Sequence, residues 1–378
     1  MSVIVRPVTT KKDLKAFIEF PNKLYKDNPC FVPKLYFDEV ETLDSRKNPA
    51  FAFCEAAYWL AWDADGKEPV GRVAAIVNRR ANEKWDHREV RFGWFDFIDD
   101  PAVSAALLDK VVEFGRQRGM DTVVGPLGFT DFDAEGMLVE GFDQMCTMAL
   151  LYNHPYYPEH MEKLGYKKEV DWLEYKIFIP RELPARIPAV ASVVERRYDL
   201  HVRKITKREI KREGLGYKIF DMVNETYSEL YNFTILPKEM IDKYIGFYLG
   251  FLDLDFVTVI EDGQKNMVAF AITMPSIVRA LRKSGGRLFP FGWYHIVKSM
   301  YLKHEEAVEL LLIGIKPEYR SKGVLALILN DLIPRYSQAG FVYGESNAEL
   351  ETNTPMQSAW NMFHREQNKR RRVYMKKI

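Results

Sequence analysis

The chain has 378 residues, of which 47% are hydrophobic and 28% charged, and its formal net charge is +1. This composition is typical of a globular protein long enough for one or two domains. The near-neutral charge disfavours a DNA-binding protein, and no apolar run approaches the roughly 18 residues that span a bilayer. Three widely spaced cysteines (Cys30, Cys54 and Cys146) and a start without a signal-peptide pattern indicate a cytoplasmic protein without disulfides or a bound metal.

The first half is expected to alternate strands and helices. Thr10 is a predicted helix N-cap, Asp65-Gly66 a hairpin turn, and Asp100-Pro101 the start of a long helix. The predicted strands lie at residues 3–7, 55–62, 70–77, 90–97, 121–125 and near 175, and the predicted helices at 11–25, 101–118 and 157–164.

The second half repeats this order, with another Asp-Gly hairpin turn at Asp262-Gly263. Its predicted strands lie at residues 200–205, 256–261, 267–273, 308–315, 341–344 and 371–375, and its predicted helices at 209–230, 238–249, 323–338 and 354–364. The repeat indicates a duplication. The alternation predicts an α/β fold in which each half has a mixed central sheet flanked by helices, with domains at 1–180 and 200–378 and a linker at 181–199.

Residues 308–329 are the most informative segment. A strongly apolar strand runs into a turn, and Gly323 then opens a helix. Free backbone N–H groups and the helix dipole favour an anion at such a junction. Arg320 and Lys322 add full positive charges, and Gly323 allows close approach of a ligand. The alternative is an ordinary strand-to-helix turn with solvated basic residues.

The run Pro-Glu-Tyr-Arg-Ser-Lys-Gly-Val at 317–324 resembles motif A of the GNAT superfamily of acyl-CoA acyltransferases, whose signature is Arg/Gln-x-x-Gly-x-Gly/Ala. Arg320 and Gly323 match it, whereas Leu325 stands where the family has Gly or Ala. The resemblance implies that the CoA pyrophosphate and pantetheine are bound by Leu312, Ile313, Ile315, Arg320, Ser321, Lys322, Gly323, Val324 and Leu325.

Motif B of that family, Asn-x-x-Ala-x-x-x-Tyr, has partial echoes. Asn353 fits its Asn and is implied as a further cofactor-binding residue, but Trp360 stands at the Tyr position. In the first half Met161 takes the Tyr place. Neither half therefore has the family's Tyr general acid. Nearly the whole chain also resembles bacterial proteins with two tandem GNAT-like domains, at residues 93–97, 125–129, 140–143 and 152–157.

The corresponding junction of the first half, at residues 95–101, is not expected to bind CoA. It has no Gly and no basic residue, and Asp99 and Asp100 occupy the place that a phosphate would take. A long loop follows later with Asp131, Asp133 and Glu135. That loop either reaches a cleft or is a solvated acidic loop.

Glu309 is the first candidate for the base that deprotonates an amine acceptor. It lies eleven residues before Arg320, and some members of the GNAT family that modify protein lysines carry a catalytic Glu at this spacing. Burial beside apolar residues is expected to raise its pKa, although a solvent-facing strand Glu is the alternative. Glu345 is the second candidate and His364 the third. A backbone N–H near Ile315 is expected to polarise the thioester carbonyl.

Two other segments leave alternatives open. Residues 279–304 form a basic, aromatic insertion that docks on a membrane, shapes an acceptor pocket or packs as a lid. Residues 369–372 are Lys-Arg-Arg-Arg, which either contact nucleotide or RNA or lie in a solvated final strand.

The sequence thus predicts a CoA-dependent N-acyltransferase that transfers an acyl group, from acetyl-CoA or another acyl-CoA, to an unknown amine through its C-terminal domain. A homodimer is compatible with this. One alternative is a non-catalytic acyl-CoA-binding module. The other is a tandem-GNAT transferase that uses aminoacyl-tRNA.

Overall fold

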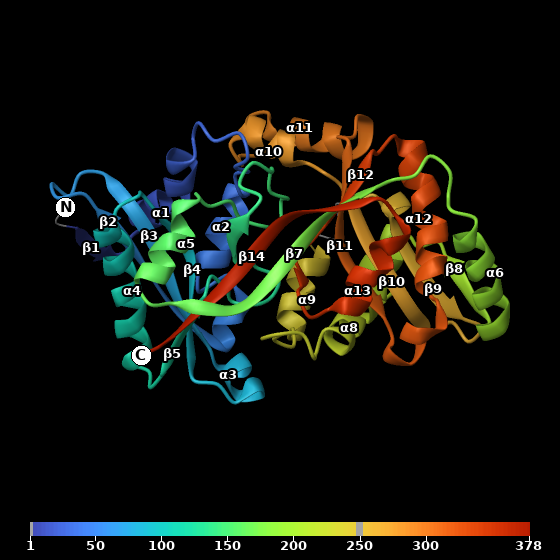
Figure 1. The fold of residues 1–378 in the computed structure, drawn as a ribbon, viewed down its shortest axis with the longest axis horizontal. Coiled ribbons are helices and arrows are strands. Elements are labelled where there is room, and N and C mark those ends of the chain that lie inside the picture. Colours follow the sequence, from blue (N-terminus) through green and yellow to red (C-terminus); the bar gives the residue numbers. More distant parts are fainter. Residues whose placement is uncertain (1–2, 247–251) are drawn as a thin grey trace. The chain divides into compact units, whose positions relative to one another are not determined.

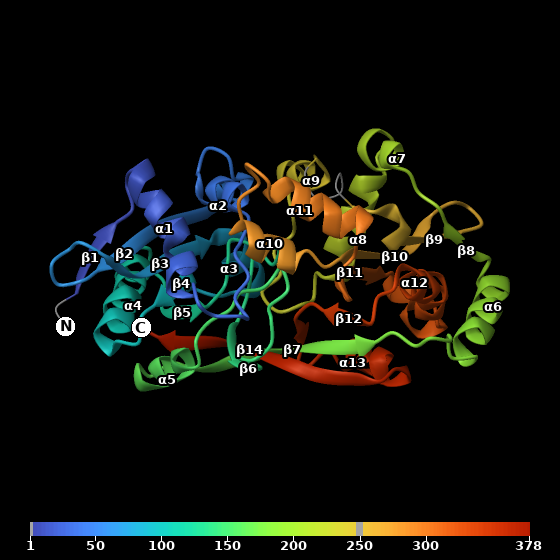
Figure 2. The ribbon, with the colours of Figure 1, turned by 90° about the horizontal axis from the view of Figure 1, so that it is seen from above.

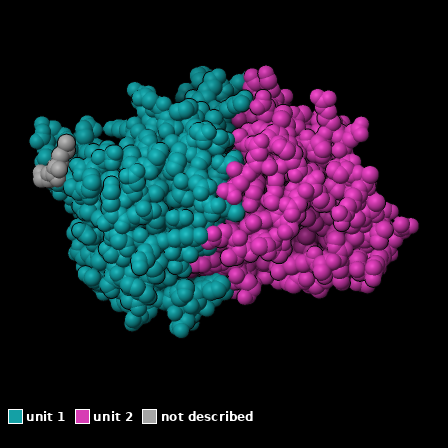
Figure 3. Space-filling view, viewed as in Figure 1, with its two compact units in different colours: residues 1–173, 278–295, 368–378 teal, residues 174–277, 296–367 magenta. Residues whose placement is uncertain are grey.

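The computed structural model describes residues 3–246 and 252–378, and the chain divides into two compact units. Unit 1 comprises residues 1–173, 278–295 and 368–378, and unit 2 comprises residues 174–277 and 296–367 (Figure 3). Each unit thus draws on both halves of the sequence. Residues 181–199, expected as a linker, contain helix α6 (Arg186–Tyr198), which belongs to unit 2. Residues 247–249 of the predicted helix 238–249 lie outside the described part.

Unit 1 contains a mixed sheet with strand order β1-β2-β3-β4-β5-β14, and β6 pairs with β14 (Figure 1). Strands β4 and β5 are parallel, and the other pairs along this order are antiparallel. The strands are β1 (Ile4–Pro7), β2 (Cys54–Trp62), β3 (Pro69–Asn78), β4 (Glu89–Phe97), β5 (Thr122–Gly125), β6 (Met137–Glu140), the start of β7 (Lys167–Phe178) and the end of β14 (Arg365–Lys377). The helices are α1 (Lys11–Leu24), α2 (Tyr36–Leu43), η1 (Pro49–Ala52), α3 (Arg79–Trp85), α4 (Pro101–Arg116), α5 (Tyr156–Lys163), α10 (Val278–Ser284) and the start of α11 (Gly292–Val297).

The predicted helix starts of unit 1 are confirmed. Thr10 caps α1 in a capping box with Asp13. Asp100 caps α4 by accepting from the N–H of Ala102 at 2.8 Å, and Pro101 is its first residue. The buried face of α4 joins the apolar core of the sheet, and burying each such side chain contributes about 1.5–3 kcal/mol.

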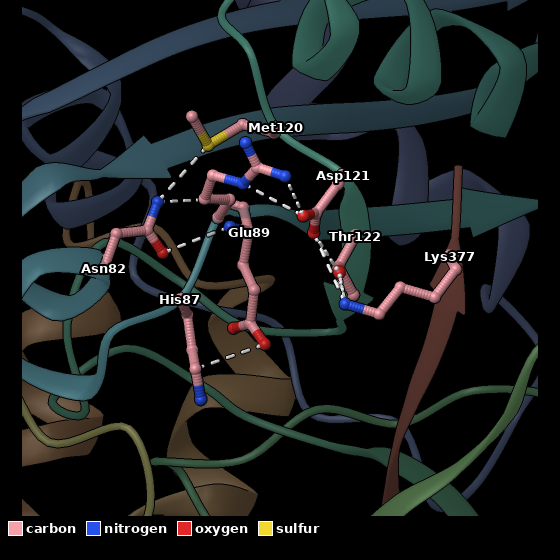
Figure 4. A network of polar contacts seen from close by, with 8 residues as sticks. Asn82, His87, Glu89, Met120, Asp121, Thr122 and Lys377 are labelled. Carbon is pink, nitrogen blue, oxygen red and sulfur yellow. Dashed lines mark hydrogen bonds and ion pairs between the residues drawn. The ribbon is translucent and has the colours of Figure 1, made fainter.

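The last strand is anchored in unit 1 by a polar network at its end. Lys377 Nζ donates to Thr122 Oγ1 at 2.7 Å and lies 3.4 Å from Asp121 Oδ1 (Figure 4). In the same network, the side chain of Asn82 donates to the backbone oxygen of Glu89 at 2.9 Å. Long-range polar contacts therefore join the start of β5 to the C-terminal strand.

The basic run of β14 is only partly solvated, because two of its four residues are buried. Lys369 and Arg371 have no exposed surface, and their side chains donate to the backbone oxygens of Met145 and Leu151. Arg372 pairs with buried Asp171 at 2.8 Å. These contacts leave Lys369 and Arg371 without surface for a nucleotide or RNA contact.

Unit 2 contains a mixed sheet with order β7-β12-β11-β10-β9-β8, and β13 pairs with β7 (Figures 1 and 2). Only β11 and β12 are parallel in this order. The strands are β8 (Leu200–Arg203), β9 (Val257–Asp262), β10 (Met267–Pro275), β11 (Ala307–Ile315), β12 (Tyr343–Ser346) and β13 (Glu349–Leu350), with the end of β7. The helices are α6, α7 (Lys207–Arg212), α8 (Leu215–Thr226), α9 (Lys238–Tyr244), η3 (Leu254–Phe256), η4 (Lys298–Leu302), η5 (Pro317–Lys322), α12 (Leu325–Ala339), α13 (Thr354–Ala359) and η6 (Trp360–Met362).

Each unit contains the same central element, in which a helix connects two parallel strands. In unit 1 it is β4-α4-β5, and in unit 2 it is β11-α12-β12. The predicted α/β class with mixed sheets is therefore confirmed. The first strand of each element ends at the junction that the sequence singled out.

Candidate functional site

Strands β11 and β12 are paired only along the first half of β11. They pair in parallel from Ala307 with Tyr343 as far as Leu310 with Ser346, and β12 ends there. Strand β11 continues to Ile315 along β10 alone. The outer edge of β11 after Leu310 therefore has no strand partner among the described residues, and its backbone polar groups are open to other partners.

A β-bulge in β11 lies where its pairing with β12 ends. The register between β10 and β11 shifts between Ile272 and Thr273. Ile272 pairs with Leu312 and Thr273 with Leu310, so Leu311 is the extra, unpaired residue of the bulge. Asn347, just after β12, donates its amide to the oxygen of Leu311 at 3.1 Å. Its side-chain oxygen is buried without a hydrogen-bond partner. The end of the pairing with β12 thus brings together a bulged backbone and a buried amide oxygen that can still accept a hydrogen bond.

Tyr227 fills the next position along this edge. Its hydroxyl donates to the oxygen of Ile313 at 3.0 Å and accepts from the N–H of Ile313 at 3.2 Å. Burial raises the pKa of Tyr227 to about 12, so the phenol is neutral. No local sequence pattern indicates this contact, because the two residues are 86 positions apart.

The strand β11 leads into the junction predicted as an anion site. Gly323 follows η5 with φ of 79° in the left-handed region, which only glycine adopts readily. A Cβ at this position would lie 3.3 Å from the methyl groups of Val190 and Val194 in α6. Helix α12 then starts without a side-chain cap and without an acidic residue in its first turn. The amides of Ala326 and Leu327 donate to the backbone oxygens of Gly323 and Val324 at 2.9 and 3.0 Å, so the junction offers an anion chiefly the positive end of the helix dipole.

The two basic side chains of this junction have protein partners. Arg320 donates to the backbone oxygen of Thr226 at 3.1 Å and of Ile315 at 3.4 Å. The ammonium of Lys322 lies 4.3 Å from the ring centroid of Tyr319 and 5.0 Å from that of Tyr198. Ser321 is exposed. Arg320 thus ties the end of α8 to the end of β11, while its charge remains at the solvent-exposed junction.

These residues fit a CoA-type ligand in part. The uncapped α12 start, the left-handed Gly323 and the buried free oxygen of Asn347 provide donors and acceptors of the kinds that a pyrophosphate and an amide chain require. Leu325, which departs from the family pattern, is the first residue of α12. Arg320 and Tyr227 are the residues whose present contacts compete with such a ligand.

The two predicted catalytic carboxylates lie side by side. Glu309 and Glu345 are register partners on the parallel strands β11 and β12, so both side chains point to the same face. Glu309 is 1% exposed and Glu345 is 8% exposed. Ser276 Oγ donates to Glu309 Oε1 at 2.9 Å. The alternative of a solvent-facing Glu309 is therefore wrong.

The remaining predicted residues are placed as follows. Leu312, Ile313 and Ile315 lie on β11 beyond the bulge, where the strand no longer pairs with β12 and Tyr227 bonds the backbone of Ile313. Asn353 caps α13 and accepts from the N–H of Met356 at 3.4 Å, which gives it a structural role. The ring of His364 lies 4.7 Å from that of Phe178, and the side chain is exposed.

Glu349 is a titratable residue that the sequence did not indicate. Burial raises its pKa to about 7, and Trp360 Nε1 donates to its Oε1 at 2.8 Å. The other carboxylate oxygen is buried without a hydrogen-bond partner. A carboxyl group that titrates near neutral pH is a candidate acid or base.

In unit 1 the junction after β4 has the opposite character. The Asp100 carboxylate occupies the N-terminus of α4, and Asp99 Oδ1 lies 2.9 Å from His160 Nε2. The start of α4 is thus already satisfied by the chain's own carboxylate, as the sequence predicts. The acidic side chains of the loop that follows β5 are half-buried, and burial raises the pKa of Asp133 to about 6 and that of Glu135 well above its usual value.

Unit 1 also contains a polar pocket. Arg72 Nε and Asp96 Oδ2 form a buried ion pair at 2.7 Å on its wall, and Trp94 Nε1 donates to Glu39 Oε2 at 2.8 Å. Lys34 donates to the backbone oxygen of Met148, and burial lowers its pKa to about 8. The pocket therefore carries two acidic and two basic groups in a largely water-excluded setting.

Residues 3–246 and 252–378 contain no helix long and apolar enough to cross a bilayer. The same residues contain no cluster of three or more His, Cys, Asp or Glu side chains arranged to hold a metal ion.

No protein-family model matches the chain. Protein YghO of Escherichia coli (strain K12) is 30% identical over 383 residues, which cover 99% of this chain and 95% of YghO. A protein named bacterial ceramide synthase, from Caulobacter vibrioides (strain NA1000 / CB15N), is 25% identical over 335 residues, which cover 85% of this chain and 82% of that protein.

Solved structures share the fold of the whole chain. A tandem GNAT protein from the clavulanic acid biosynthesis pathway has a TM-score of 0.54 and 12% identity, covering 100% of this chain and 98% of that one. A GCN5-related N-acetyltransferase from Sphaerobacter thermophilus has a TM-score of 0.53 and 13% identity, covering 99% and 95%. The predicted pair of tandem GNAT domains is thereby confirmed as a fold.

Proposed function

Because this chain belongs to the family of protein YghO and has the tandem GNAT fold, we propose that it is a CoA-dependent N-acyltransferase that acts through unit 2. The observation that carries the proposal is the junction at which β11 leaves β12 and runs through Gly323 into the uncapped α12. A matching junction in unit 1 is closed by Asp100, so only unit 2 offers its helix start to an anion.

The acceptor that we propose is a long-chain amine. One relative, 25% identical over most of its length, is named a ceramide synthase, and a ceramide is a long-chain amino alcohol acylated on nitrogen. The acyl donor would accordingly be a long-chain acyl-CoA as well as, or in place of, acetyl-CoA. One turnover assay tests both the class of reaction and the identity of the acceptor.

In the proposed reaction, acyl-CoA supplies the thioester whose C–S bond breaks as the amide N–C bond forms. The start of α12, with Arg320, Ser321 and Lys322, would hold the pyrophosphate by charge and backbone N–H groups. The edge of β11 at Leu312, Ile313 and Ile315 would hold the pantetheine amides, as in the family that the sequence resembles.

In this proposal, side chains around β11 carry out the two proton transfers, one from the amine and one to the thiolate. The attacking amine must lose a proton, and we assign this to Glu309, with Glu345 beside it as the second carboxylate. The leaving thiolate must gain one, and the neutral phenol of Tyr227 lies against the same strand. Tyr227 thus takes the place of the motif B tyrosine that the sequence lacks.

Binding is tested by calorimetry with palmitoyl-CoA and acetyl-CoA. We expect Arg320→Glu to weaken binding at least tenfold, which corresponds to about 1.4 kcal/mol. Because Arg320 also holds two backbone oxygens, Ser321→Glu provides a second variant that adds a negative charge without removing a contact of Arg320. Ser337→Glu, exposed near the other end of α12, is the matched control, and Asp100→Ala tests unit 1.

Turnover is tested by release of free CoA thiol from palmitoyl-CoA in the presence of sphinganine. We expect Glu309→Gln to lower kcat at least a hundredfold with little change in acyl-CoA affinity. No thiol release by the wild type despite acyl-CoA binding would support the non-catalytic module instead. If the wild type binds neither acyl-CoA, the CoA proposal is refuted.

A further inference from the structure

Four large side chains of unit 1 point into solvent within six residues of chain. Phe289 is 79% exposed, Phe291 70%, Trp293 49% and Tyr294 45%. We call these four residues the aromatic tip. Folded proteins expose scattered apolar side chains, but a group of this size marks a surface that contacts an apolar partner.

Local backbone hydrogen bonds hold the aromatic tip in its outward position. The N–H of Trp293 donates to the oxygen of Leu288 at 2.8 Å, and that of Arg287 donates to Ser284 at 3.1 Å. A Cβ at Gly292 would lie 1.8 Å from the oxygen of Arg287, so the loop closes only with glycine there. The exposure of the four rings is therefore built into the fold.

The residues that precede the aromatic tip, from α10 to Gly286, pack against the rest of unit 1. Helix α10 buries Val278, Ala280 and Leu281. The oxygen of Gly286 accepts from the N–H of Tyr36 at 2.9 Å, at the start of α2 (Figure 2). Tyr36 also lines the polar pocket of unit 1. The aromatic tip is thus carried on a firm base beside that pocket.

The charges around the aromatic tip are all of one sign along the chain. No Asp or Glu occurs between Asp262 and Glu305. Four exposed basic residues lie within the unit 1 part of this stretch: Arg279, Arg282, Lys283 and Arg287. Arg287 pairs with Glu19, so the positive character rests mainly on Arg282 and Lys283.

We propose that the aromatic tip is a membrane-docking surface that inserts into the interface of a bilayer containing anionic lipids. Trp and Tyr rings favour the headgroup region, Phe rings favour the acyl boundary, and basic side chains beside them attract anionic headgroups. A protein partner would be expected to meet this surface with carboxylates rather than a uniform apolar layer. The inference goes beyond the proposed function, since docking needs no acyl transfer, although it suits an enzyme with a lipid acceptor.

The test is co-sedimentation of the full chain with vesicles of phosphatidylglycerol and phosphatidylcholine (1:1) or of phosphatidylcholine alone. We expect the wild type to bind the mixed vesicles at least tenfold more tightly. Phe289→Ser combined with Phe291→Ser should lower binding at least tenfold. The control Val193→Ser with Ile235→Ser, which changes two other side chains that are each 52% exposed, should leave it unchanged.

A second pair of variants separates charge from apolar contact. Arg282→Glu with Lys283→Glu should weaken binding to the mixed vesicles about tenfold or more, whereas Lys11→Glu with Lys12→Glu, an equally exposed pair in α1, should not. Equal binding to both vesicle types, or no loss on changing the two Phe residues, refutes the inference. So does a wild type that binds no vesicles but self-associates through the aromatic tip in sedimentation velocity.

Acyl-CoA calorimetry on the same variants keeps the two proposals apart. A chain that binds palmitoyl-CoA but no vesicles refutes the docking inference alone. A chain that docks on vesicles but binds neither acyl-CoA refutes the proposed function alone.

Discussion

Glu349 is expected to make unit 2 less stable as the pH rises. Its ordinary pKa of 4.5 is raised to about 7 by burial, which Trp360 and Arg365 offset only in part. In the unfolded chain the carboxyl group ionises above pH 4.5, whereas in the folded chain it keeps its proton up to about pH 7. The stability that the neutral group contributes is therefore complete below pH 4.5 and is lost as the pH rises to 7.

The size of the effect follows from the difference between the two pKa values. At 1.36 kcal/mol for each pKa unit, the loss is about 3 kcal/mol, and partial exposure of the side chain makes this an upper value. Glu349→Gln removes the titration and keeps an oxygen for the Trp360 N–H. The variant should match the wild type near pH 4.5 and be more stable by up to about 3 kcal/mol above pH 7.

Urea unfolding followed by circular dichroism at several pH values between 4.5 and 8 measures the difference. Glu366→Gln, an exposed carboxylate of unit 2, is the control and should give no pH-dependent difference. If Glu349→Gln destabilises the chain, or if its effect is constant across this range, the group is ionised in the folded state. The reasoning from burial is then wrong.

Four further variants test other contacts by the same measurement of unfolding. Gly340→Ala forces a left-handed conformation in open space and should cost about 1–2 kcal/mol, whereas Gly323→Ala should cost more because its Cβ also meets two valines at 3.3 Å. Asp96→Asn should cost about 3–5 kcal/mol, since it leaves the Arg72 guanidinium buried without its carboxylate, and a cost below 1 kcal/mol would contradict a buried ion pair. Tyr227→Phe should cost about 1–3 kcal/mol by leaving the N–H and oxygen of Ile313 unpaired; no change in stability would show that this contact is not formed.

Features set by neighbouring residues could be predicted from the sequence. The caps at Thr10 and Asp100 and the glycine before α12 depend on side-chain chemistry within a few positions, so local patterns identify them. The α/β class follows in the same way, because hydrophobic periodicity and turn residues are local. The apolar neighbours of Glu309 along β11 are compatible with burial, but a solvent-facing side chain remains the alternative until the fold shows Glu309 buried.

Features set by distant residues could not be predicted. The contact of Tyr227 with Ile313 joins residues far apart, and no pattern in either segment indicates it. The run at residues 369–372 has the composition of a solvated basic end, yet Lys369 and Arg371 are buried. Hydrogen bonds to the backbone oxygens of residues 145 and 151 help to offset the free-energy cost of removing these two charges from water. The division of the chain also depends on long-range packing, which places residues 278–295 and 368–378 in unit 1.

The two units show how one fold can carry an anion site in one copy and lack it in the other. Both connect parallel strands through a helix, and in both the helix start leaves amides that need a partner. In α4 that partner is the carboxylate of Asp100, with Pro101 removing one donor. In α12 no side chain takes this role, and the residue that precedes its N-terminal turn is a glycine in the left-handed conformation. The chemistry that distinguishes the copies is therefore confined to a few residues at one junction, and substitutions there should change ligand binding without changing the fold.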